Sequence, residues 1–291
     1  MELPLITLRM RHKTTYSYRQ PVMLGPHRLM LRPRESRDLR LLSSDVTITP
    51  AAVVTWAYDV FGNAVATAAF HDRTERLIIE SSAELQLDAA AWPVFDIAAS
   101  AIFYPFQYAD AEIIDLGALA LQQYSDTQAQ LRGWARSFIL REPTDTLSLL
   151  KDLSDGVSRA IRYQSREEEG TQLPTETLDR GWGTCRDFAV LLAEAARSLG
   201  FGARIVTGYL YNPNETLIGS NGLGSTHAWT EIFAPGVGWI ALDPTNRNVG
   251  GSNLIPVAVV RDIRQAAPVA GSFIGSSDAF AGMSAEVFVT A

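Results

Sequence analysis

Short runs of alternating apolar and polar residues fill the first third of the chain. Residues typical of turns separate these runs, such as the Gly25-Pro26 pair and the segment from Asp59 to Asn63. Alternation with a period of two indicates a strand with one buried face, and several short strands at this spacing are typical of an antiparallel sandwich. The predicted strands cover residues 5–8, 14–18, 28–31, 45–48, 53–58, 64–70 and 77–87.

The pattern changes after residue 88. Residues 88–109 are rich in alanine and aromatic residues and contain Pro93 and Pro105, which is typical of a connection between domains. Beyond it, apolar residues recur at steps of three and four over residues 146–161, as expected for a helix. The predicted fold class is therefore α+β, with an N-terminal antiparallel β-sandwich domain over 1–95 and a second domain over 96–291.

Composition narrows the classes of function. Hydrophobic residues make up 47% of the 291 positions, which is enough for a substantial core. The chain has 25 basic and 32 acidic residues and a formal net charge of -7, so it lacks the broad positive field that attracts nucleic acid. The glycine-rich stretch 219–224 lacks the Gly-Lys-Ser/Thr ending of a phosphate-binding loop. Neither nucleic acid nor nucleotide is an expected partner.

The N-terminal residues do not resemble a signal peptide. Arg9, Arg11 and His12 interrupt the apolar positions there, and no later stretch reaches about 18 consecutive apolar residues. We expect a soluble, cytoplasmic protein with no membrane partner, and the sequence predicts no oligomeric state.

The chain has one cysteine, Cys185, and four histidines, at positions 12, 27, 71 and 227. A single cysteine excludes an intramolecular disulfide and a Cys-x-x-Cys metal site, and the histidines lack the spacing of metal ligands. We therefore expect neither a metal nor a cofactor. A lone cysteine is more often a small buried hydrophobe than a nucleophile, so its neighbours must decide its role.

Cys185 stands at the predicted start of a helix. The segment after it carries an apolar stripe that includes Phe188 and Leu192, and Gly200 is a plausible C-terminal cap. The N–H groups and positive dipole end of a helix favour the thiolate form of a cysteine. Such a thiol is a nucleophile only with a base nearby, so a histidine is required.

One histidine has a fitting context. Residues 225–233 alternate like a strand that contains His227, and residues 238–243 form a second strand that ends at Asp243, before Pro244. A hairpin centred on Pro235 would place His227 directly opposite Asp243, with Cβ atoms about 4.5–5.5 Å apart. A carboxylate at that distance can orient an imidazole.

These motifs resemble a known family. The sequences Thr184-Cys-Arg-Asp, His227-Ala-Trp and Gly238-Trp-Ile-Ala-Leu-Asp-Pro-Thr are similar to those of bacterial transglutaminase-like cysteine peptidases, and the likeness covers roughly residues 145 to 250. The strands before residue 95 resemble the β-sandwich that precedes the core in this family, through segments 14–16, 25–28, 31–33 and 59–63.

The resemblance implies a catalytic triad of Cys185, His227 and Asp243. It also implies a transglutaminase-like, papain-like core with the nucleophile at a helix N-terminus packed on an antiparallel sheet. Cys185 would attack an amide carbonyl of a protein or peptide substrate to form a thioester, which water would hydrolyse. The backbone N–H of Cys185 is one natural oxyanion donor, and Tyr163, Gln164 and Trp182 are candidates for the second.

Other interpretations stay open. The thioester could pass to a primary amine, which would make the protein a cross-linking transglutaminase, or the fold could serve as a catalytically inactive protein-binding module. Without catalysis, Cys185 would be a structural thiol at a helix start, His227 a hydrogen-bonded sheet residue and Asp243 a turn carboxylate. The segment 211–224 between the two motifs could border the cleft or be an ordinary connection.

Overall fold

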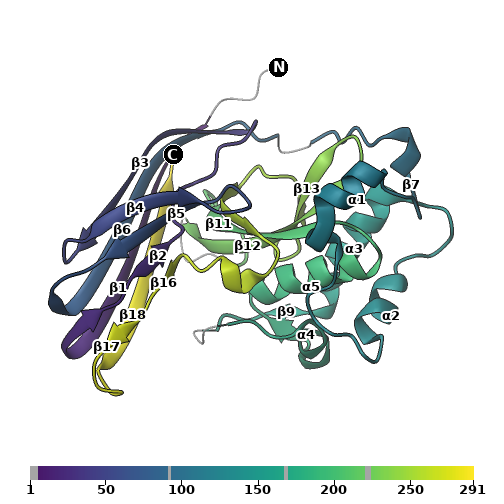
Figure 1. Cartoon of the computed structure of the whole chain (residues 1–291). Helices are drawn as coiled ribbons and strands as arrows, with labels where there is room; N and C mark the ends of the chain where they lie inside the picture. Colours follow the sequence, from purple (N-terminus) through teal and green to yellow (C-terminus); the bar gives the residue numbers. More distant parts are fainter. Residues whose placement is uncertain (1–5, 91–92, 167–169, 220–223) are drawn as a thin grey trace.

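The computed structural model describes residues 6–90, 93–166, 170–219 and 224–291. Figure 1 shows a strand-rich layer structure on one side of the molecule and a mixed α/β core on the other. The predicted α+β class, with a β-sandwich and a core built around a helix on an antiparallel sheet, is confirmed.

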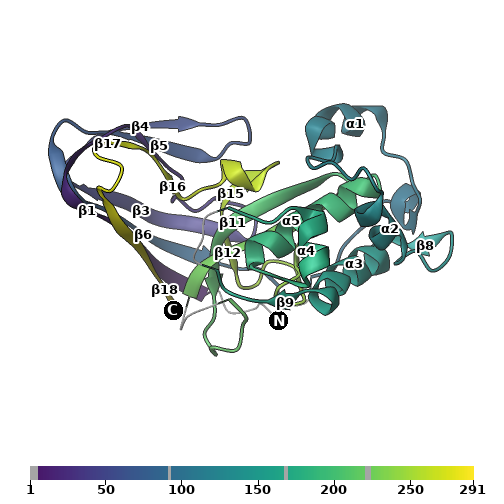
Figure 2. The same ribbon diagram turned by 90° about the horizontal axis from the view of Figure 1, so that it is seen from below.

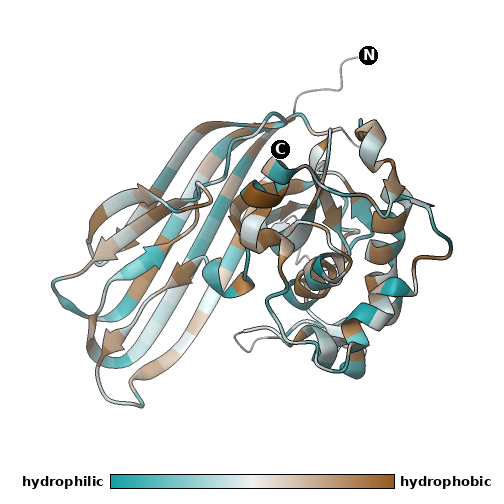
Figure 3. Ribbon diagram, turned by 45° about the vertical axis from the view of Figure 1, so that its right-hand side comes forward, coloured by the Kyte–Doolittle hydropathy of each residue, from teal (hydrophilic) through white to brown (hydrophobic). Residues whose placement is uncertain are grey.

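Two antiparallel sheets form the sandwich, and the alternation read from the sequence faces its interior. The order of the first sheet is β17-β1-β6-β3, with β18 also paired to β1, and that of the second is β16-β2-β5-β4. In β6, every second residue from Leu77 to Leu87 is buried, and Figure 3 shows the matching alternation of hydropathy along the sandwich strands. The strands are β1 (Ile6–Leu24), β2 (His27–Leu29), β3 (Leu39–Thr49), β4 (Val53–Tyr58), β5 (Ala64–Ala69), β6 (Arg73–Leu87), β16 (Val269–Ala270), β17 (Phe273–Ile274) and β18 (Phe280–Thr290).

Both ends of the chain contribute to this sandwich. Strand β18 pairs with β1 from Arg9↔Thr290 to Tyr18↔Phe280, while β16 pairs with β2 and β17 with β1. Figure 2 shows these yellow C-terminal strands among the purple and blue strands of the sandwich. The sequence-based division assigned the three strands to 96–291, whereas their hydrogen bonds attach them to the sheets begun by residues 6–90. The division at residue 95 stays a prediction for where the chain first leaves the sandwich.

The core contains a third antiparallel sheet, of order β14-β13-β12-β11-β15, against which α5 packs. The core also contains two short strand pairs, the antiparallel β7–β8 and the parallel β9–β10. Its strands are β7 (Phe103–Tyr104), β8 (Thr144–Asp145), β9 (Arg162–Tyr163), β10 (Trp182–Gly183), β11 (Ala203–Tyr211), β12 (Gly224–Ala234), β13 (Gly238–Asp243), β14 (Asn248–Val249) and β15 (Leu254–Val260). Its helices are η1 (Ala99–Ala101), α1 (Asp110–Leu116), η2 (Gly117–Ala120), α2 (Gln130–Arg136), α3 (Thr146–Ala160), α4 (Pro174–Arg180), α5 (Cys185–Ser198) and η3 (Ile263–Gln265).

Helix α5 is the buried centre of the core. Its residues from Asp187 to Arg197 are all buried, including a charged pair near its C-terminal end. Arg197 Nη1 lies 2.6 Å from Glu194 Oε1, and the same guanidinium donates to the carbonyl of Ala203. Because each charge is paired and hydrogen-bonded, the helix can be buried on all sides without leaving an isolated ion.

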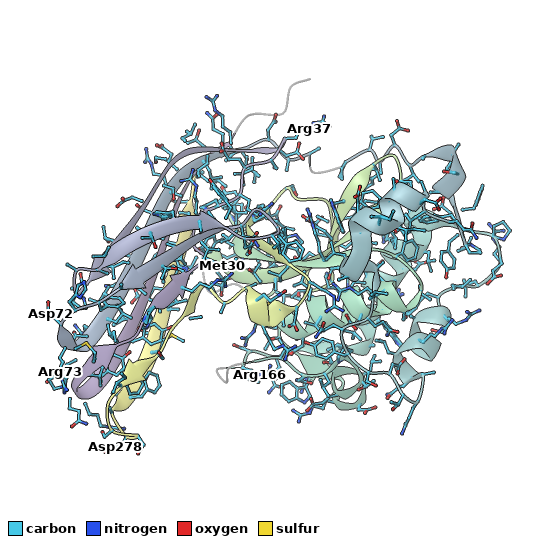
Figure 4. The ribbon with its side chains drawn as sticks, in the orientation of Figure 1. Met30, Arg37, Asp72, Arg73, Arg166 and Asp278 are labelled. Atoms are coloured by element: carbon cyan, nitrogen blue, oxygen red, sulfur yellow. The ribbon has the colours of Figure 1, made fainter. Side chains whose placement is uncertain are left out.

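The sandwich and the core share one hydrophobic cluster. Leu8, Met10 and Met30 from the sandwich belong to the same buried cluster as the apolar residues of α5. Met30, labelled in Figure 4, lies where the two parts meet. The sandwich therefore buries part of the hydrophobic surface of the core.

Polar contacts fix the same junction. The fully buried Asn63 donates from Nδ2 to the carbonyl of Val259 (2.8 Å) and accepts from its N–H (2.9 Å), which pairs the backbone of β15. On β1, His12 Nδ1 lies 2.9 Å from the hydroxyl of Tyr209 on β11. Strand β11, which pairs with β12, is thus joined to the sandwich by a buried hydrogen bond.

Across the described ranges, we find no helix with both the length and the apolar character needed to cross a membrane.

Candidate active site

Cys185 is the first residue of α5, as predicted, and it is half-buried. A capping box begins the helix, because both the N–H and the Oγ1 of Thr184 donate to Asp187 Oδ2, at 2.8 and 2.9 Å. The cysteine therefore lies within the first turn, where helix N–H groups and the helix dipole favour negative charge.

Asp187 also holds the segment that precedes the cysteine. Its second oxygen, Oδ1, accepts from the N–H of Gln172 at 2.7 Å and lies 3.3 Å from Nη2 of Arg166, which is labelled in Figure 4. Gly183 is required here, since an added Cβ would lie 2.8 Å from the Cβ of Asp187. Asp187 thus fixes the position of Cys185 through its contacts with Thr184 and Gln172.

His227 and Asp243 meet in the interior of the core. His227 Nε2 lies 2.8 Å from Asp243 Oδ2, and the two residues are only 3% and 1% exposed. The imidazole stacks on Trp229, with ring centroids 6.3 Å apart and planes inclined by 23°. The carboxylate and the neighbouring ring fix the orientation of the imidazole.

The hairpin that brings them together differs from the predicted one in register. It is centred on Gly236 rather than on Pro235, and its last ladder pair is Thr230↔Leu242. Asp243 is therefore a diagonal neighbour of His227 and not its direct partner. A shift of two residues keeps both side chains on the same face, and a diagonal pair is still within reach of long side chains.

Asp243 is held by four hydrogen bonds. Oδ1 accepts from the backbone N–H groups of Thr245 (3.0 Å) and Asn246 (3.4 Å), while Oδ2 accepts from His227 and from Asn246 Nδ2 (2.9 Å). Burial alone would raise the pKa of Asp243, but the His227 charge, its hydrogen bond, and the bonds from Asn246 and Thr245 lower it below the ordinary value. The carboxylate is therefore ionised over the neutral range.

The pKa of His227 is set by opposing effects. Burial lowers it, but the charge and hydrogen bond of Asp243, followed by the interaction with Cys185, raise it to about 10. The contribution of Cys185 to this pKa indicates that the sulfur lies near the ring, and Nδ1 makes no hydrogen bond of standard geometry among the described residues. Nε2 is thus bonded to the Asp243 carboxylate, and Nδ1 is the ring nitrogen available to the Cys185 thiol.

Two family models match separate parts of the chain. Residues 132–244 match the transglutaminase-like superfamily, and residues 8–86 match the bacterial transglutaminase-like N-terminal region. The first match contains all three residues of the predicted triad, and the second covers most of β1 to β6. The chain therefore contains a transglutaminase-like core preceded by a bacterial transglutaminase-like N-terminal region.

Its relatives extend over nearly the whole chain. A protein of Mycobacterium tuberculosis is 27% identical over 282 residues, covering 93% of this protein and 88% of the relative. One of Mycobacterium leprae is 24% identical over 268 residues, covering 92% and 93%. Both are described only as uncharacterized.

A solved structure from Cytophaga hutchinsonii, provisionally assigned as a cysteine protease, is similar with a TM-score of 0.75 and 20% identity, covering 99% of this chain and 91% of that one. The likeness is to the fold alone, over nearly the whole of both chains.

The three candidate oxyanion donors occupy different positions in this transglutaminase-like core. Burial raises the pKa of Tyr163 to about 12, and Cys185 adds to that shift, which indicates that the tyrosine lies near the sulfur. Gln164 is exposed, and its backbone N–H donates to the carbonyl of Gly183 at 2.9 Å. The ring of Trp182 lies under the guanidinium of Arg180, 5.6 Å from its centroid. The second donor stays a prediction. Among the three candidates, Tyr163 is the one whose pKa shift includes a contribution from Cys185.

Asn246 is a site residue that sequence reasoning missed. Its position three residues after Asp243, in Asp-Pro-Thr-Asn, is a spacing that allows a turn closed by the aspartate side chain. That spacing was the available signal, although it does not reveal the second contact that the Asn246 side chain makes.

Within the described residues, no group of three or more His, Cys, Asp or Glu side chains is arranged to hold a metal ion. The site's polar groups instead pair with each other.

Proposed function

We propose that this protein is a thiol-dependent acyl-transfer enzyme that hydrolyses an amide or peptide bond through a thioester on Cys185. The observation that carries the proposal is the imidazole of His227, whose Nε2 is bound to Asp243 while Nδ1 is left for the thiol at the start of α5. In this proposal Cys185 is the nucleophile, His227 the acid and base, and Asp243 the residue that orients the imidazole.

The resting site would be a thiolate beside an imidazolium. A His227 pKa near 10 supports this, because the ring then holds a proton at neutral pH beside the ionised Asp243. The helix N-terminus favours the negative sulfur. The nucleophile would thus be charged before the substrate binds.

Acylation would begin when the thiolate attacks the amide carbonyl carbon and forms a carbon–sulfur bond, while the carbonyl electron pair moves to oxygen. The backbone N–H of Cys185 would stabilise the oxyanion, a contribution of about 3–4 kcal/mol for one such donor. As the carbon–nitrogen bond breaks, Nδ1 of His227 gives its proton to the leaving amine. The products of this step are the amine, a thioester and a neutral imidazole.

Deacylation would reverse the proton's path. Neutral His227 takes a proton from water, the hydroxide oxygen attacks the thioester carbon, and the carbon–sulfur bond breaks. The acid product leaves, and the thiolate–imidazolium pair is restored. Transfer to a primary amine would follow the same steps with the amine in place of water.

Alkylation of Cys185 by iodoacetamide tests the nucleophile without knowledge of the substrate. Because the chain has one cysteine, the intact mass reports on that site alone. Rates would be measured between about pH 5 and about pH 9, the range that spans an ordinary thiol titration, for the wild type, His227→Ala and the control His71→Ala. His71 is exposed and lies in the sandwich.

The proposal predicts fast alkylation of the wild type and of His71→Ala down to about pH 6, with a loss of about tenfold or more in His227→Ala. Equal rates in all three proteins, with the pH dependence of a free thiol, would contradict it. Hydrolysis and amine transfer are then separated by incubating a peptide pool with a fluorescent primary amine in heavy-oxygen water and identifying which label enters the products.

A further inference from the structure

The side chain of Asn246 connects two parts of the site. Its Nδ2 donates to Asp243 Oδ2 at 2.9 Å, and its Oδ1 accepts from the backbone N–H of Ile218 at 2.7 Å. One end of the amide therefore contacts the carboxylate that holds His227, and the other contacts a segment 28 positions earlier in the chain.

We propose that Asn246 is a positioning residue that fixes the orientation of the Asp243 carboxylate and, with the same amide, holds the segment 212–219 as a wall of the active site. This inference rests on the proposed function, because it assigns Asn246 a role in the reactivity of the Cys185–His227 pair.

The contact with Asp243 constrains Oδ2, the carboxylate oxygen that accepts from His227. Oδ2 accepts from both His227 Nε2 and Asn246 Nδ2, so the amide donor limits rotation of the carboxylate about its bond to Cβ. The amide cannot be reversed without cost, since its carbonyl would then face the carboxylate and its donor would face the Ile218 N–H. The two contacts thus specify one orientation of Asn246.

The segment 212–219 is already shaped for this contact. The buried Asn212 side chain closes a turn by accepting from the N–H groups of Thr216 (3.0 Å) and Leu217 (3.3 Å). Asn246 then binds the next N–H along the chain, that of Ile218. The turn is therefore anchored at both of its ends by asparagine side chains.

This segment touches the surroundings of both catalytic groups. Leu217 packs against the cluster that contains Trp229, the residue stacked on His227. At Gly219, an added Cβ would lie 3.1 Å from the hydroxyl of Tyr163, the tyrosine whose pKa is influenced by Cys185. Holding this segment in place therefore fixes one side of the space in which an acyl group would meet the sulfur.

The test compares Asn246→Ala with Gln107→Ala. Gln107 also has an amide side chain, is exposed, and lies outside the segment 212–219. Two measurements are made on each full-length protein: the pH dependence of Cys185 alkylation by iodoacetamide, and hydrogen exchange of the peptide that contains Ile218. We expect Asn246→Ala to lower the alkylation rate near pH 6 by about tenfold, the effect of losing one hydrogen bond to a charged group, and to speed exchange at Ile218. Gln107→Ala should change neither.

A double variant tests whether Asn246 acts through the carboxylate. If it does, Asn246→Ala should have little further effect on alkylation in an Asp243→Asn background. If the reductions in alkylation rate caused by the two single substitutions multiply in the double variant, the proposal is overturned. It is also overturned if Asn246→Ala changes only the alkylation rate or only the exchange at Ile218. The wild type and His227→Ala, run beside them, distinguish the two claims: if these two alkylate alike, the proposed function fails, whereas a His227 effect without an Asn246 effect refutes this inference alone.

Discussion

Replacing Asp243 by asparagine removes the charge beside His227 while keeping the size of the side chain. Oδ1 would still accept from the N–H groups of Thr245 and Asn246, which places the new NH₂ group against His227 Nε2. Two donors cannot bond to each other, so Nε2 of His227 must be the unprotonated nitrogen that accepts from the new NH₂ group. The imidazole proton must then stay on Nδ1. His227 would then be unable to accept a proton from the thiol or from water.

The size of the effect follows from the pKa of His227. A rise from 6.5 to about 10 corresponds to about 5 kcal/mol in favour of the imidazolium, and Asp243 is the largest of the effects that raise it. We expect Asp243→Asn to lower the alkylation rate near pH 6 by at least about 100-fold. Acyl transfer should fall by up to about 10⁴-fold, the loss caused by this change in a Ser-His-Asp triad.

The same pair gives stability a defined pH dependence. The raised pKa of His227 contributes stability that is fully present below 6.5 and disappears as the pH rises through about 10. The lowered pKa of Asp243 contributes stability above 3.8, which is lost as the pH falls below that value. The wild type should therefore exceed Asp243→Asn in unfolding free energy most strongly between about pH 4 and about pH 6.5, by about 3–5 kcal/mol, the typical cost of breaking a buried ion pair.

Urea unfolding at a series of pH values, with alkylation rates on the same samples, measures both effects. Asp155→Asn is the matched control, because Asp155 forms a surface ion pair with Lys151 at 2.6 Å that should contribute no more than about 1 kcal/mol. The reasoning would be refuted by an Asp243→Asn protein that alkylates like the wild type, or by a stability difference that is the same at every pH.

Three further predictions concern the junction between sandwich and core. Burial lowers the pKa of His12 to about 4, so between pH 6.5 and pH 4 this histidine takes up a proton in the unfolded chain but not in the folded protein. The free energy of unfolding of the wild type should therefore fall by up to about 3 kcal/mol over this range. Urea titrations of His12→Gln should not show this decrease. Asn63→Ala leaves the N–H and carbonyl of Val259 unpaired and should cost about 2–5 kcal/mol by chemical denaturation, whereas the exposed Asn214→Ala should change stability by less than about 0.5 kcal/mol. Deleting residues 280–291 uncovers the edge of β1, and size-exclusion chromatography should show aggregates; a stable monomer would contradict the role given to β18.

Local signals were sufficient for the elements that carry the site. The start of α5 at Cys185 follows from the apolar stripe behind it, and Gly200, with φ of 93°, ends the helix as predicted. Strand β4 occupies residues 53–58, the predicted range. The run 14–18 was predicted as a separate strand and is part of the longer β1, because the polar residues between it and the first run lie within one continuous ladder with β6.

The register of the hairpin illustrates what the pattern leaves open. Strand alternation has a period of two, so it determines which side chains share a face but cannot distinguish registers that differ by two residues. The observed register depends on the turn, where Gly236 and Gly238 have φ of 90° and 81°. The pairing of His227 with Asp243 was therefore predictable as a same-face contact, but its diagonal geometry was not.

Contacts between distant segments were the other gap. The pairing of β18 with β1 joins residues from opposite ends of the chain, and no local pattern specifies which edge a C-terminal strand will cover. The buried pair Glu194–Arg197 has the spacing of an ordinary exposed helix pair, and only the packing around α5 makes it internal. Asn246 likewise needs the segment at Ile218 to be folded beside it before its second contact exists.

The most direct test of acyl transfer is to trap the thioester. The wild type, Cys185→Ala and His227→Ala would be mixed with an aryl acetate, quenched in acid, and analysed by intact mass and peptide mapping. We predict one acetyl group on Cys185 in the wild type that is removed by hydroxylamine, slower acetylation in His227→Ala and none at this position in Cys185→Ala. Acetylation confined to lysines, or acetylation of Cys185 at the same rate without His227, would contradict the assignment of Cys185 and His227 as a catalytic pair.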